Sequence, residues 1–93
     1  MLFLREHLLN EYNWPVENDN ALYSGVPSRR KFDRYNGYQL LFIINFYASI
    51  SDRNSIKDGQ LMEELINMQL PLDARSEISV FNWLRETFNN VLA

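Results

Sequence analysis

The apolar positions of the chain are most concentrated in Tyr38–Ile50, which reads YQLLFIINFYASI. At 100° per residue, the apolar side chains of this segment cover about 260° of a helix circumference. The remaining polar stripe, about 60° wide, holds Tyr38, Asn45, Ser49 and Asp52. A helix that is apolar on most sides is covered by other helices or by a second copy of itself. The pattern therefore predicts a central helix at about 37–50 and favours self-association.

A first helix is predicted at about 2–12. Leu4, Leu8 and Tyr12 recur at every fourth position, which is the spacing of one helix face. Pro15 then disfavours helical geometry in the residue before it, so we expect the helix to end shortly after Tyr12.

The connection from this helix to the central helix shows no clear period. Residues 13–28 contain two prolines, a glycine and four Asn or Asp residues, which together predict an irregular segment. Ser28 can cap a short helix at 29–35. The pair Asn36-Gly37 then marks a break before the central helix.

Two more helices are predicted in the C-terminal half. Ser55 and Asp58 have the spacing of a capping box at the start of a helix at about 56–69. Asp73 follows a proline turn and is expected to cap a last helix at about 74–91. No strand-like alternation of useful length is present. We therefore expect an all-α fold, a small bundle of four main helices.

Composition fits a single helical domain, 1–93: 46% of the residues are hydrophobic and 23% are charged. The sequence has no Cys and one His, and it lacks a phosphate loop and a G-x-S-x-G motif. We therefore expect no catalytic residues, no cofactor and no metal site, although polar groups that meet only in the fold could form a small enzyme. No segment has the length of a membrane span or the form of an export signal, so a cytoplasmic protein is predicted.

Positive charge is concentrated in one short segment. The net charge is −3, yet residues 28–34 hold four of the nine basic residues: Arg29, Arg30, Lys31 and Arg34. This cluster could contact phosphate or an acidic partner. A nucleic-acid-binding regulator is therefore one alternative. The other is that these side chains only neutralise the protein's own acidic helices and cover apolar surface.

Aromatic side chains supply the remaining candidate contacts. Trp83 falls on the polar face of the last predicted helix, where it is either covered by residues 13–28 or anchors a partner. Trp14, Tyr35 and Tyr38 are further candidates for partner binding. The leading interpretation is a non-catalytic protein–protein interaction module, a small regulator, adaptor or inhibitor, that forms a homodimer.

Overall fold

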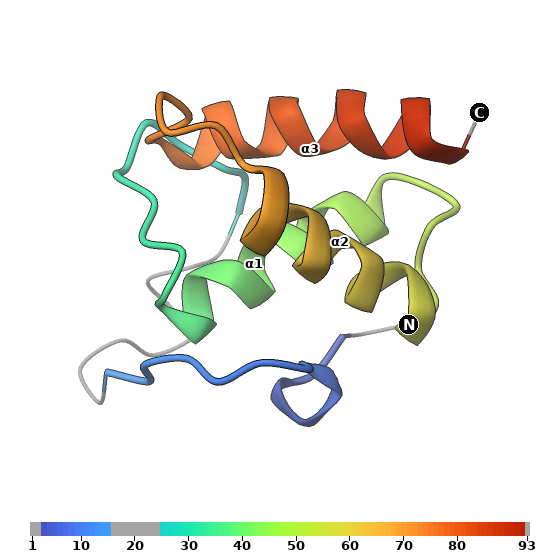
Figure 1. Cartoon of the computed structure of the whole chain (residues 1–93), viewed down its shortest axis with the longest axis horizontal. Coiled ribbons are helices and arrows are strands. Elements are labelled where there is room, and N and C mark those ends of the chain that lie inside the picture. The colour runs from blue at the N-terminus through green and yellow to red at the C-terminus, as the bar shows by residue number, and fades with distance from the viewer. Residues whose placement is uncertain (1–2, 16–24, 93) are drawn as a thin grey trace.

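A computed structural model describes residues 3–15 and 25–92 of the chain. This part of the chain contains three α-helices: α1 (Gly37–Ser49), α2 (Ile56–Gln69) and α3 (Glu77–Leu92). Each helix contacts the other two. In Figure 1, α3 runs along the top of the view and the N-terminal segment passes below α1 and α2. The all-α class is confirmed for the described residues, but the prediction of four main helices is wrong.

The central helix forms where the sequence predicts it. The side chain of Asn36 accepts hydrogen bonds from the N–H groups of Tyr38 and Gln39, which caps the first turn of α1. Every apolar side chain of α1 is buried or half-buried. Apart from Ile50, which follows α1 and is 56% exposed, the broad apolar arc is thus buried or half-buried within one chain, so it does not by itself require a second copy.

The core gathers side chains from all three α-helices and from three segments outside them. Its buried members are Phe3, Phe32, Leu40, Ile43, Ile44, Tyr47, Met62, Leu65, Ile66, Leu70, Val80, Phe81, Leu84 and Phe88. Phe3 and Phe32 belong to no α-helix, yet both are almost completely buried. The three helices alone therefore leave gaps that the irregular parts of the chain fill.

α2 also matches its predicted bounds. Ser55 accepts a hydrogen bond from the backbone N–H of Asp58 at 3.0 Å, and Asp58 accepts one from the N–H of Ser55 at 3.3 Å. This reciprocal capping box satisfies two of the N–H groups that a helix start leaves without partners.

α3 begins three residues later than predicted. Asp73 does not cap it, because the backbone of Arg75 pairs with the preceding segment: its carbonyl accepts the N–H of Phe32 at 2.7 Å. Ser76 takes the capping position, and its hydroxyl accepts the N–H of Ser79 at 3.2 Å. A helix that started at residue 74 would lose the pairing with Phe32.

The predicted helix at 2–12 is wrong. Within its described part, residues 3–12, the only helical piece is a single 3-10 turn, η1 (Arg5–His7). The backbone instead finds partners on other elements. The Asn45 side chain, for example, accepts the N–H of Phe3 at 2.7 Å and donates to its carbonyl at 2.9 Å. Because α1 and α2 offer such partners, the extended course does not leave these backbone groups unsatisfied.

The short helix considered at 29–35 is absent. Here the chain is extended and then turns, with the N–H of Asn36 bonded to the carbonyl of Asp33 at 3.0 Å. Residues 13–15 and 25–28 are irregular, as predicted, and the rest of the predicted irregular segment, 16–24, lies outside the described residues.

Gly59 on α2 is in close contact with the N-terminal segment. A Cβ atom at this position would overlap the ring of Phe3. The ring is almost completely buried, so it has little room to move aside. Glycine is therefore needed here for close approach rather than for an unusual backbone angle.

We predict that Gly59→Ala destabilises the protein by about 1–3 kcal/mol, since the added methyl overpacks the site. In a Phe3→Ala background the same change should stabilise by up to about 1 kcal/mol, the usual preference of a helix for alanine. Urea unfolding of the four proteins measures both effects. If Gly59→Ala stabilises the wild-type background as much as the Phe3→Ala background, Phe3 does not occupy the space beside Gly59.

Candidate functional site

Two segments outside the three α-helices donate backbone N–H groups to buried carboxylates. We call residues 3–15 the N-terminal strap and residues 25–36 the basic strap. Each strap is bonded to a glutamate whose side chain is completely buried: Glu63 on α2 and Glu77 at the start of α3, both 0% exposed. Burial of a carboxylate costs free energy unless hydrogen-bond donors surround it. The donors around these two residues therefore indicate their role.

Glu63 is surrounded by donors from the N-terminal strap. Its two oxygens accept the backbone N–H groups of Leu9 at 2.8 Å and Asn10 at 3.0 Å. The Tyr12 hydroxyl donates to the same carboxylate at 2.6 Å, and the Asn10 side-chain amide donates at 3.3 Å. The carboxylate thus acts as a fixed acceptor for the strap.

Tyr12 is the titratable partner of Glu63. Burial, followed by the hydrogen bond to the Glu63 carboxylate, raises the pKa of Tyr12 to about 12. The folded protein therefore holds the phenol proton more tightly than the unfolded chain, whose tyrosines titrate near 10. The resulting stabilisation is complete below about pH 10 and is lost as the pH rises toward about 12.

We predict that Tyr12→Phe removes the loss of stability that deprotonation of Tyr12 causes at alkaline pH. The free energy of unfolding, measured with urea from about pH 9 to about pH 12, should fall less steeply in Tyr12→Phe than in the wild type. Tyr35→Phe is the matched control, because Tyr35 is exposed, and it should keep the wild-type slope. Equal slopes in Tyr12→Phe and the wild type would show that the Tyr12 proton is not linked to folding.

Glu77 is the corresponding hydrogen-bond acceptor for the basic strap. Its carboxylate accepts the backbone N–H and the hydroxyl of Ser28, both at 3.1 Å. The Gln39 amide donates to it at 2.9 Å, and the Arg30 guanidinium lies 3.4 Å away. The backbone N–H groups of Glu77 and Ile78 in turn donate to the carbonyls of Arg30 and Ser28. Arg30 was expected to contact phosphate or an acidic partner, and here it takes part in holding the strap to α3.

The basic strap forms one wall of a surface groove. The groove has a volume of about 670 Å³ and lies between residues 31–35 and the turn that joins α2 to α3. Leu70, Leu72, Ala74 and Arg75 form the other wall. We call this hollow the basic groove, because it contains the cations Lys31, Arg34 and Arg75 and one carboxylate, Asp33.

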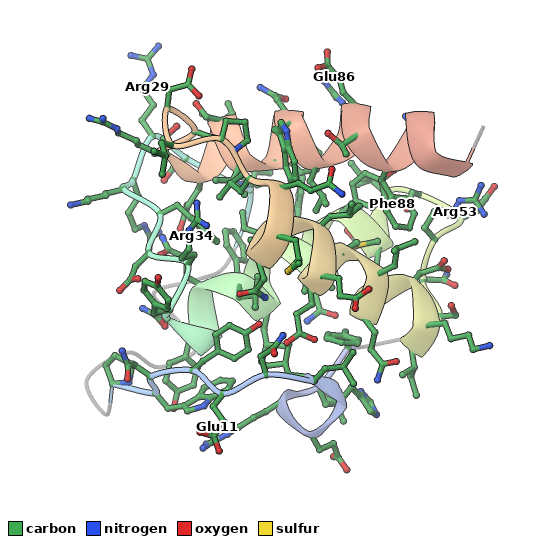
Figure 2. All side chains as sticks on the ribbon, in the orientation of Figure 1. Glu11, Arg29, Arg34, Arg53, Glu86 and Phe88 are labelled. Atoms are coloured by element: carbon green, nitrogen blue, oxygen red, sulfur yellow. The ribbon has the colours of Figure 1, made fainter. Side chains whose placement is uncertain are left out.

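The predicted basic cluster is only partly assembled in this groove. Lys31 and Arg34 line it, whereas Arg29 and Arg30 do not. In Figure 2, Arg34 lies between the basic strap and the C-terminal end of α2, while Arg29 extends away at the edge of the molecule. Arg75 was not expected to join the cluster. The bond from the Phe32 N–H to its carbonyl brings it there.

The candidate aromatic contacts fall in three different places. Tyr35 is 62% exposed and lines the basic groove. Trp14 and Tyr38 stack edge to face with ring centres 5.1 Å apart, and the Arg5 guanidinium lies 4.2 Å from the Trp14 ring. Trp83 is half-buried against the edge of the core. Of the four predicted partner-binding aromatics, Tyr35 alone lines the basic groove.

Trp14 and Tyr38 contribute to the attachment of the N-terminal strap. The Trp14 ring lies close to Gly37, where a Cβ atom would come within 2.5 Å of it. Asn13 pairs with the same region, since its N–H donates to the carbonyl of Tyr35 at 2.7 Å and its carbonyl accepts the N–H of Gly37 at 2.9 Å. These contacts fix the end of the strap at the start of α1.

The described residues show neither a metal-binding group nor a membrane-spanning helix. Residues 3–15 and 25–92 contain no group of three or more His, Asp or Glu side chains placed to hold a metal ion. None of the helices in this part of the chain is long and apolar enough to cross a bilayer. Comparison with protein-family models, with curated proteins and with solved structures found no significant match.

Proposed function

We propose that the protein is a non-catalytic protein–protein interaction module, a small regulator, adaptor or inhibitor, and that the basic groove is its contact surface. The observation that carries this proposal is the exposure of two large side chains at the groove. Tyr35 is 62% exposed and Leu72 is 86% exposed. The buried residues Phe32 and Leu70 lie beside them in the lining. An exposed tyrosine beside apolar side chains is typical of the residues that dominate protein interfaces.

The state of the buried polar groups supports a binding role over a catalytic one. Glu63, Glu77, Gln39 and Asn45 all bond to backbone groups of the straps. No buried side-chain oxygen or nitrogen among the described residues lacks a partner. A catalytic acid or base needs access to a substrate, and these groups face the protein's own backbone.

The nucleic-acid alternative is weaker than the protein-binding proposal at this groove. Affinity for nucleic acid grows with the number of phosphate contacts. Arg30 is paired with Glu77, and the carboxylate of Asp33 lines the groove beside the cations. Both features reduce the positive potential that a phosphate backbone would meet.

Self-association and a cytoplasmic location both stay predictions. A homodimer would use exposed apolar side chains outside α1, such as Met68, since those of α1 are buried or half-buried within the chain. The binding role proposed for the basic groove does not depend on either prediction.

The proposal is tested by selecting binders from a random peptide library displayed on phage, with the intact chain as target. We expect selected peptides to bind about tenfold more weakly to Tyr35→Ala or Leu72→Ser, because interface anchors of this kind carry a large share of the binding energy. Met68→Ser is the matched control: it also removes an exposed apolar side chain, but one that does not line the groove. Failure to select peptides, or equal binding by all variants, would contradict the proposal.

A further inference from the structure

We infer that the basic groove recognises an extended acidic segment of a partner protein, in which carboxylate side chains flank an aliphatic one. This inference rests on the proposed binding function and adds the chemistry of the ligand. It follows from three features of the groove: its charge, the anchoring of its arginines and the apolar side chains that share its lining.

The charge of the groove is opposite to that of the whole protein. The lining holds Lys31, Arg34 and Arg75 against the single carboxylate of Asp33, while the chain as a whole carries −3. A local surplus of cations on an acidic protein favours approach of an acidic ligand at this site over the rest of the surface.

The two arginines of the groove are held by the same turn. Arg34 donates from Nη2 to the carbonyl of Leu70 at 3.4 Å, and Arg75 donates from Nε to the carbonyl of Leu72 at 3.3 Å. These bonds restrict the side chains before any ligand arrives, which lowers the entropy lost on binding. The guanidinium N–H groups that remain on each arginine can pair with a carboxylate in the bidentate geometry that arginine favours.

Apolar side chains share the lining with these cations. Phe32 and Leu70 are almost completely buried, whereas Leu72 and Tyr35 are largely exposed. Burial of an aliphatic ligand side chain against them would remove apolar surface from water on both partners. The groove therefore suits a ligand that combines charged groups with an apolar one.

A peptide fits this lining better than a nucleic acid. Asp33 lies in the groove, and Asp73 is exposed in the turn that forms its other wall. A phosphate backbone carries charge at every unit and would meet these carboxylates. A peptide can place its carboxylates opposite the arginines and a neutral residue opposite the aspartates.

The test uses fluorescence anisotropy of labelled peptides with the intact protein. The first probe is a nonapeptide of glutamates around a central leucine. In the second probe glutamine replaces each glutamate, and in the third serine replaces the leucine. We expect the first to bind about tenfold more tightly than the second, as charge-assisted hydrogen bonds predict, and also more tightly than the third.

Variants of the cations test which side chains carry the recognition. Arg75→Gln and Lys31→Gln should weaken binding of the first probe, and Arg75→Lys should recover only part of it, because lysine keeps the charge but lacks the planar fork. Arg85→Gln is the matched control on α3. It removes an exposed arginine outside the groove and should leave binding unchanged.

Three outcomes would overturn the inference. One is equal binding of the glutamate and glutamine peptides. Another is indifference of the glutamate peptide to Arg75→Gln and Lys31→Gln. The third is tighter, Arg75-dependent binding of an oligothymidine of about the same charge, which would assign the groove to nucleic acid. If neutral library peptides still require Tyr35, the binding function stands and only the acidic ligand is wrong.

Discussion

The structure depends on two carboxylates that are completely buried, Glu63 on α2 and Glu77 on α3. Each accepts backbone N–H groups from a segment that is not helical, Leu9 and Asn10 in one case and Ser28 in the other. A buried carboxylate without donors would cost several kcal/mol. The helices therefore depend on the straps for donors to their buried carboxylates, and the straps depend on the helices for acceptors. The two straps are part of the folded unit and are not loose connections between the helices.

This constraint explains how a short chain completes its core and builds a surface site. Three helices of this length leave apolar surface uncovered, and the straps bring Phe3 and Phe32 into the gaps. The basic strap also sets where α3 begins, since the carbonyls of Ser28 and Arg30 accept its first N–H groups. The pairing of Phe32 with Arg75 then places this arginine of the α2–α3 turn in the same groove as Lys31 and Arg34. The groove is thus a consequence of how the strap is held.

The sequence predicts those parts of the fold that local chemistry controls. Helices 37–50 and 56–69 were predicted nearly to their ends, because apolar periodicity and the Ser55–Asp58 box act within a few residues. The helix at 2–12 was wrong because a short apolar repeat was outweighed by acceptors and donors on α1 and α2. No local signal in the sequence marks Glu63 as buried. Arg75 joins the groove only through pairing between segments that are distant in the sequence.

The central claim is that Glu63 holds the N-terminal strap, and hydrogen exchange followed by NMR tests it most directly. The side chains of Leu9 and Asn10 are exposed, and surface segments of this kind normally exchange their amide protons quickly. If the carboxylate holds them, both amides should be protected in the wild type and in the control Glu64→Gln, which changes an exposed neighbour. In Glu63→Gln both amides should lose this protection, either because the N-terminal strap detaches or because the whole protein unfolds. Fast exchange of both amides in the wild type, or full protection in Glu63→Gln, would contradict the claim.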